Sequence, residues 1–153
     1  MPEDKTYDMV VHNGTVLTVN RTFDVLEKGL VCIADGRLER MEAKASKPAL
    51  PKACQIIDAQ GGIIMPGLVN THTHAPMSLF RGLADDLPLM TWLNDYIFKV
   101  EGRWLNPETV HTATLLSCAE MLLSGTTTFC DGYFFEDTVA EAVEESGMRA
   151  ILG

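Results

Sequence analysis

Basic side chains are scarce in this sequence, in which 12 Lys and Arg residues stand against 21 Asp and Glu residues for a formal net charge of -9. A chain this acidic repels phosphate groups unless it carries a basic patch, and the sequence contains no cluster of Lys or Arg. It also lacks an apolar run of the roughly 20 residues that a membrane-spanning helix needs. Nucleic acid and membrane are therefore excluded as main partners.

The sequence predicts no secretory leader either. The segment from Met1 to Asp8 has neither the basic start nor the apolar run of a signal peptide. No Cys-x-x-Cys pair is present, so neither a zinc knuckle nor a small secreted disulfide framework is indicated. We predict a cytoplasmic protein whose cysteines are buried and reduced. These cysteines are Cys32, Cys54, Cys118 and Cys130.

What is present is enough apolar sequence for a core, since 46% of the residues are hydrophobic and 22% are charged. The N-terminal part is rich in short β-strand patterns. Asn13-Gly14 separates two of them and predicts a first hairpin, and Asp35-Gly36 predicts a second, because both dipeptides supply the positive φ angles of a type I′ turn. Residues 44–52 are predicted to form an exposed loop.

Beyond Gly62 the pattern changes to alternating strands and helices. Residues 63–70 are almost entirely apolar and predict a strand buried on both faces of a parallel sheet, with Pro66 limiting the paired part to the residues after it. An amphipathic helix over 88–101 follows, and then a helix that begins after Asn106-Pro107 and ends at Ser124-Gly125. A strand over 126–131, a helix over 137–146 and the first residues of a third strand complete the pattern.

This order predicts an α/β fold with a parallel sheet. Two strand-helix units and part of a third strand cannot close a (β/α)8 barrel, which takes about 250 residues. We therefore interpret the chain as the N-terminal part of a longer protein or a truncated gene product.

His72 and His74 are the first candidates for a functional site. Side chains at positions i and i+2 of a strand point to the same face, and the carboxyl end of a parallel strand is where α/β folds place their chemistry. Two neutral imidazoles that converge suit a divalent metal such as zinc. The His-x-His pattern alone is weak, because surface or packed histidines show it as well.

The run from Ile64 to His74 resembles the first-strand signature of the amidohydrolase superfamily, in which a small β-sandwich precedes a metal-bearing (β/α)8 barrel. The segment from Ala75 to Pro88, together with Trp92-Leu93 and Glu101, is similar to the 5′-methylthioadenosine/S-adenosylhomocysteine deaminase branch. The resemblance extends from Tyr7 to Gly153. It implies a β-sandwich segment over 7–62 and the first part of the barrel over 63–153, so the barrel is incomplete in this chain.

The resemblance also implies roles for individual residues. His72 and His74 match metal ligands, with zinc as the expected metal and iron as the alternative. Glu101 matches a position that contacts ribose hydroxyl groups, and Trp92 matches an aromatic residue that lines the substrate pocket. Glu101 could instead be a solvated charge at a helix end, and Trp92 a core residue. The remaining ligands and the catalytic acid or base are expected beyond Gly153.

Three other residues are weaker candidates. His12 and His111 lie in the predicted hairpin and on the long predicted helix, where structural roles are expected. Asp131, at the end of the second predicted strand, is placed where chemistry would occur.

The leading hypothesis is thus a metal-dependent deaminase of an adenine nucleoside: 5′-methylthioadenosine, S-adenosylhomocysteine or adenosine. One alternative is another amidohydrolase, acting on guanine, cytosine or a triazine, which have no sugar diol for Glu101 to hold. Another is a non-catalytic half-barrel that pairs with a second chain. The sequence leaves the oligomeric state open, a homo-oligomer included.

Overall fold

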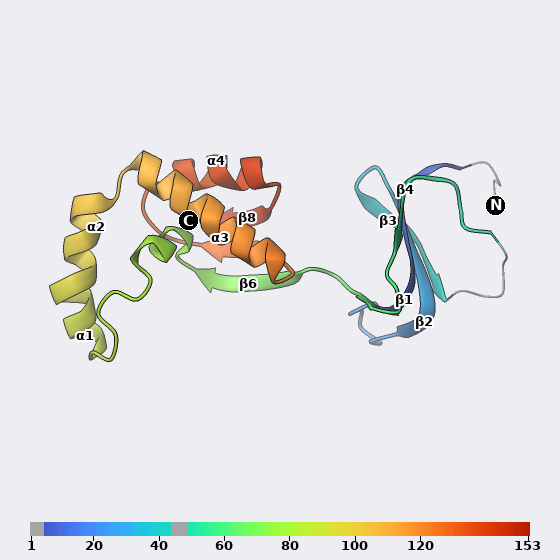
Figure 1. The fold of residues 1–153 in the computed structure, drawn as a ribbon, viewed down its shortest axis with the longest axis horizontal. Coiled ribbons are helices and arrows are strands. Elements are labelled where there is room, and N and C mark those ends of the chain that lie inside the picture. Colours follow the sequence, from blue (N-terminus) through green and yellow to red (C-terminus); the bar gives the residue numbers. More distant parts are fainter. Residues whose placement is uncertain (1–4, 44–48) are drawn as a thin grey trace. The chain divides into compact units, whose positions relative to one another are not determined.

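The computed structural model describes residues 5–43 and 49–153, and these divide into two compact units on either side of the Pro66–Gly67 bond (Figure 1). The sequence had placed the boundary between residues 62 and 63. Part of the predicted loop over 44–52 falls on residues 44–48, outside the described residues. No helix in the described ranges is long and apolar enough to cross a membrane.

The N-terminal unit contains one sheet with the strand order β3-β2-β1-β4, and a short strand, β5, pairs with β1. Strands β2 and β3 run antiparallel to their neighbours, whereas β4 and β5 run parallel to β1. Val10, Leu30 and Cys32 form its buried cluster. The strands are β1 (Tyr7–Leu17), β2 (Val25–Ala34), β3 (Arg37–Ala43), β4 (Ala53–Asp58) and β5 (Ile63–Ile64).

The first predicted hairpin is wrong. Strand β1 runs straight through Asn13-Gly14, and its register against β2 shifts on either side of Gly14. Asn13 has φ 60° and uses its side chain to donate to Asp58 Oδ1 at 2.7 Å, so the dipeptide forms a β-bulge in place of a turn. The second hairpin is confirmed: Ala34 pairs with Arg37, and Asp35 and Gly36 both have positive φ.

The C-terminal unit contains a parallel sheet with the strand order β6-β7-β8, which confirms the predicted parallel α/β pattern. Helices α3 and α4 lie side by side against this sheet (Figure 1). Phe129 of β7 packs with Val110, Cys118 and Val139 in the core between sheet and helices. The elements are β6 (Leu68–Thr73), a 3-10 helix η1 (Ala75–Phe80), α1 (Leu89–Thr91), a π-helical segment η2 (Trp92–Ile97), α2 (Phe98–Trp104), α3 (Pro107–Leu123), β7 (Thr126–Asp131), α4 (Glu136–Ser146) and β8 (Arg149–Leu152).

Helix α3 begins as the sequence predicts. The Asn106 side chain accepts a hydrogen bond from the Thr109 N–H, the Thr109 hydroxyl accepts one from the Asn106 N–H, and Pro107 occupies the first helical position. This reciprocal pair satisfies two of the backbone donors that a helix start leaves open.

Two predictions about the apolar segments need correction. Ile63 and Ile64 pair with β1 of the N-terminal unit, and only the residues beyond Pro66 join the second sheet. Leu68 and Val69 are exposed and not buried on both faces, because β6 is an outer strand of the described sheet. The predicted helix over 88–101 is present as α1, η2 and α2, and it continues to Trp104.

The cysteines follow the prediction only in part. Cys32 and Cys118 are buried, and burial raises the pKa of both thiols. Cys54 is exposed and Cys130 is half-buried, so the expectation of four buried thiols is wrong for these two. No disulfide joins any of the four, all of which lie in the described ranges.

Candidate active site

The structure brings the two candidate metal-binding histidines together at the carboxyl end of β6. His72 lies near the end of the strand and His74 follows it directly. Their ring centroids are 5.1 Å apart and the ring planes are inclined by 76°. Both imidazoles therefore project from the same strand end, as their i, i+2 spacing predicts.

The neighbouring strand fixes the orientation of His74. Its Nδ1 lies 2.6 Å from the carbonyl oxygen of Gly132, which follows β7. A carbonyl group can only accept a hydrogen bond, so in the neutral imidazole Nδ1 carries the proton and Nε2 has the lone pair. This arrangement, in which one ring nitrogen is tied to the backbone and the other is left for a ligand, is typical of metal-binding histidines.

Asp131 holds the backbone at the same place. Its Oδ1 accepts a hydrogen bond of 2.7 Å from the N–H of Ala75, the residue after His74, and the Ala75 carbonyl accepts one from Ser117 Oγ. Burial raises the pKa of Asp131 to about 6, although the Ala75 N–H opposes this shift. The second oxygen, Oδ2, is buried and has no partner among the described residues. Asp131 thus lies beside the histidine pair with one acceptor unused.

Glu101 is brought to this end of the sheet by α2. Its side chain is only 7% exposed, so the alternative of a solvated helix-end charge is wrong. The hydroxyl group of Tyr133 donates a hydrogen bond to Glu101 Oε1, and the Tyr133 ring lies 5.8 Å from the His74 ring, measured between centroids. Burial raises the pKa of the Tyr133 phenol, and the bond to Glu101 raises it further, so the phenol stays protonated and donates.

Trp92 lies in a different hollow. Its indole is half-buried and its Nε1–H donates to the Leu83 carbonyl at 3.2 Å. The hollow has a volume of about 360 Å³ and includes two carboxylates of the loop before α1, Asp85 and Asp86. Whether Trp92 faces a substrate stays a prediction.

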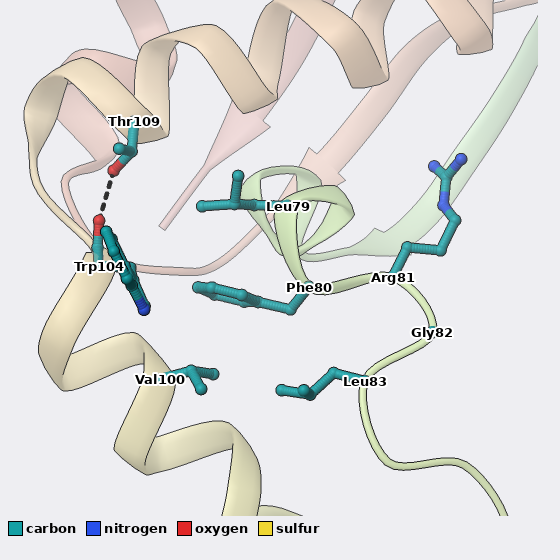
Figure 2. Close-up of a pocket in the computed structure, with 8 residues that line it drawn as sticks. All are labelled: Leu79, Phe80, Arg81, Gly82, Leu83, Val100, Trp104 and Thr109. Carbon is teal, nitrogen blue, oxygen red and sulfur yellow. Dashed lines mark hydrogen bonds between the residues drawn. The ribbon is translucent and has the colours of Figure 1, made fainter.

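A second hollow has a volume of about 520 Å³ (Figure 2). One side is formed by η1 and the segment that follows it, and the other side by α2 and the start of α3. At the edge of this hollow the Thr109 hydroxyl donates a hydrogen bond of 2.8 Å to the Trp104 carbonyl, as Figure 2 shows. It shares Phe80, Arg81, Gly82 and Leu83 with the hollow that contains Trp92. None of the four predicted site residues lines it.

The other two histidines lie outside the site. His111 on α3 is 3.3 Å from Glu145 Oε2 on α4, which fits the structural role expected for it. His12 is in β1 of the N-terminal unit, and its Nδ1 is buried without a partner among the described residues. In the described part of the chain, no group of three or more His, Cys, Asp or Glu side chains could hold a metal ion.

Sequence reasoning missed Tyr133 and Gly132. They are the first two residues after β7, as His74 is the first residue after β6, so the rule that parallel strands place chemistry at their carboxyl ends could have identified them. From the sequence, this rule was applied only to Asp131, the last residue of the strand, and not to the residues after it.

Residues 63–153 match the Amidohydrolase family. The chain belongs to the amidohydrolase family. This amidohydrolase chain is 45% identical over 146 residues to 5-methylthioadenosine/S-adenosylhomocysteine deaminase 1 of Syntrophus aciditrophicus, an alignment that covers 95% of the chain and 33% of the relative. It is 48% identical over 145 residues to the 5′-deoxyadenosine deaminase of Methanosarcina mazei, covering 95% of the chain and 32% of that protein.

A solved structure shows the same fold. The zinc-bound adenosine deaminase from Xanthomonas campestris superposes with a TM-score of 0.91 at 37% identity, over 96% of this chain and 34% of that one. The amidohydrolase chain therefore spans about a third of the length of the relatives that it matches.

Proposed function

We propose that this amidohydrolase chain belongs to a metal-dependent deaminase that replaces the exocyclic amine of an adenine nucleoside with oxygen. The observation that carries the proposal is the pair His72 and His74 at one strand end, with His74 oriented by the Gly132 carbonyl. The named activities of the relatives, all deaminases of adenosine derivatives, support the choice of substrate.

The residues present fit part of a zinc site. Two imidazoles, one of them held through its second nitrogen, are the donor type that zinc prefers, and iron is the alternative. A catalytic zinc takes three protein ligands, and the described residues supply two. When bound, the metal would supply the Lewis acidity that lets water attack an aromatic C–N bond near neutral pH. The further ligands and the catalytic acid or base are expected beyond Gly153.

The other residues of the chain would bind and orient the substrate. Glu101 can accept hydrogen bonds from the two vicinal hydroxyl groups of a ribose, and Trp92 offers a flat apolar wall to a nucleoside. Asp131 and Gly132 hold the backbone and ring of His74 in place. We further propose that residues 7–62 form a β-sandwich segment and that residues 63–153 begin a (β/α)8 barrel.

The test uses the full-length protein to which this chain belongs. Ammonia release is measured with adenosine, 5′-deoxyadenosine, 5′-methylthioadenosine and S-adenosylhomocysteine, and with guanine and cytosine as comparison substrates. Chloride release is measured with a chlorotriazine. We expect turnover of the adenine nucleosides. Turnover of only the free bases or the triazine would contradict the proposal.

Metal analysis of purified variants tests the site itself. We expect His74→Ala to lose most of the bound metal, because the site is left short of a ligand. The matched control is His111→Ala, which removes only a contact between α3 and α4 and should keep the metal. Full metal occupancy in His74→Ala would show that His74 is not a ligand.

A further inference from the structure

Tyr133 holds one oxygen of the Glu101 carboxylate, and we propose that it is a positioning residue that orients Glu101 toward the sugar diol of the substrate. The inference rests on the proposed function, in which Glu101 binds ribose. Tyr133 would not touch the substrate. It would set the direction in which Glu101 presents its second oxygen.

The surroundings of Glu101 require such a partner. Glu101 as a residue is 7% exposed, and an enclosed carboxylate is costly unless it accepts hydrogen bonds. Its Oε1 accepts one from the Tyr133 hydroxyl. Among the described residues, Oε2 has no side-chain partner, which leaves it for a ligand. Glu101 also borders a hollow of about 410 Å³ whose other lining residues are apolar. Phe98, Gly102, Leu105, Phe134 and Phe135 complete that lining.

Tyr133 is itself held in place by its neighbours. Its backbone N–H donates to Glu136 Oε1 in the first turn of α4, and its ring packs near His74 and against Phe134, with a centroid distance of 5.1 Å to the latter. The phenol therefore has little freedom to move with the Glu101 side chain. Rigid support of this kind is what keeps a binding group in its productive geometry.

The hydrogen bond also joins two elements. Glu101 lies on α2 and Tyr133 follows β7, so the bond connects α2 to the carboxyl end of the sheet, where His72 and His74 lie. If Glu101 holds the ribose, this connection sets the distance between the sugar and the histidine pair. Removing the hydroxyl should then weaken binding of the sugar and leave the metal in place.

The experiment uses Tyr133→Phe in the metal-loaded, full-length protein. This variant loses one oxygen atom and keeps the ring beside His74, so the fold and the metal content should be preserved. On ribonucleosides we expect KM to rise about 5- to 20-fold, with kcat changed by less than about 3-fold. On the 2′-deoxy substrate the rise in KM should be smaller. The matched control, Tyr96→Phe, removes an exposed phenol and should change neither constant.

A double-mutant cycle separates positioning from simple structural damage. If Tyr133 acts through Glu101, adding Tyr133→Phe to Glu101→Gln should have little further effect on KM. Additive effects, equal effects on ribo and 2′-deoxy substrates, or loss of metal from Tyr133→Phe would each overturn the inference. If the wild-type protein deaminates ribonucleosides and Tyr133→Phe keeps the wild-type KM, only this inference fails. If the wild-type protein acts on no ribonucleoside, the proposed function fails as well.

Discussion

At the scale of single residues, burial decides which reading of a charged side chain is correct. The sequence allowed Glu101 to be either a ligand-binding carboxylate or a solvated charge at the end of a helix. Its low exposure and its bond to Tyr133 remove the second reading. Burying a carboxylate costs free energy unless it is hydrogen-bonded, so a buried carboxylate is more often found at a functional site than at an arbitrary position.

This reading predicts the effect of Glu101→Gln. The amide keeps the size of the side chain and loses the charge, which weakens the hydrogen bonds from the ribose hydroxyl groups. Complete loss of this charge-assisted contact would cost about 1.5 to 3 kcal/mol of binding free energy. We expect kcat/KM on ribonucleosides to fall by roughly 10- to 150-fold.

The control for this prediction lies in the substrate. A 2′-deoxynucleoside already lacks part of the interaction, so Glu101→Gln should cost less with it. The exposed Glu120, which pairs with Arg81, offers a matched variant: Glu120→Gln should leave kcat/KM unchanged. An unaltered rate in Glu101→Gln would remove the ribose-binding role.

The candidate site was predictable as far as local periodicity reaches. The i, i+2 spacing places His72 and His74 on one face, and the structure brings their rings together. Tyr133 lies two residues past the end of β7, where the alternation of a strand no longer fixes the direction of a side chain. Its bond to Glu101 joins residues 32 apart, and no local pattern indicates it.

At the scale of elements, the N-terminal sheet shows why a strong local signal can fail. Asn13-Gly14 and Asp35-Gly36 both supply positive φ angles, and only the second forms a turn. Asn13 instead binds Asp58 with its side chain, and its carbonyl accepts the N–H of Gly61. The pairing of β1 with β4 and β5, which are distant in the sequence, determines that Asn13-Gly14 forms a bulge. A dipeptide pattern carries no information about such long-range pairing. Helix α3 was predictable because its start depends on neighbouring residues alone.

The entry to β6 and β7 allows a prediction about packing. A Cβ atom on Gly67 would lie 2.1 Å from Thr127 Oγ1 and 2.7 Å from Thr127 Cβ, so the backbone would have to move. We expect Gly67→Ala to destabilise the protein by about 1 to 3 kcal/mol. The measurement is the free energy of unfolding of the full-length protein in denaturant.

Gly102 is the matched control for this change. It lies within α2, and a Cβ atom there would meet nothing within 4 Å. Gly102→Ala should therefore stabilise the protein by about 0.5 to 1 kcal/mol, because alanine loses less conformational freedom in a helix. Equal effects of the two substitutions would show that close approach at Gly67 is not the determining factor.

At the scale of the whole chain, the C-terminal unit exposes apolar side chains on both outer strands of its described sheet. Val69 of β6 is 58% exposed and Ile151 of β8 is 68% exposed, and these are the two outer strands of the described sheet. Outer strands with free backbone groups and apolar side chains are templates for association. The chain also spans only about a third of the length of its relatives.

We therefore expect the 153-residue chain, produced alone, to self-associate and to show little deaminase activity. Size-exclusion chromatography with light scattering measures the association. Placing a charge on an outer strand opposes strand pairing, so Val69→Lys together with Ile151→Lys should shift the chain toward monomer. The matched control is Val19→Lys together with Phe23→Lys in the N-terminal unit, where both residues are more than half exposed and lie outside the strands. If this control restores the monomer as well, general charge and not the open sheet governs association. A wild-type chain that is monomeric, unfolds cooperatively and deaminates adenosine would contradict both the edge argument and the placement of the missing ligands beyond Gly153.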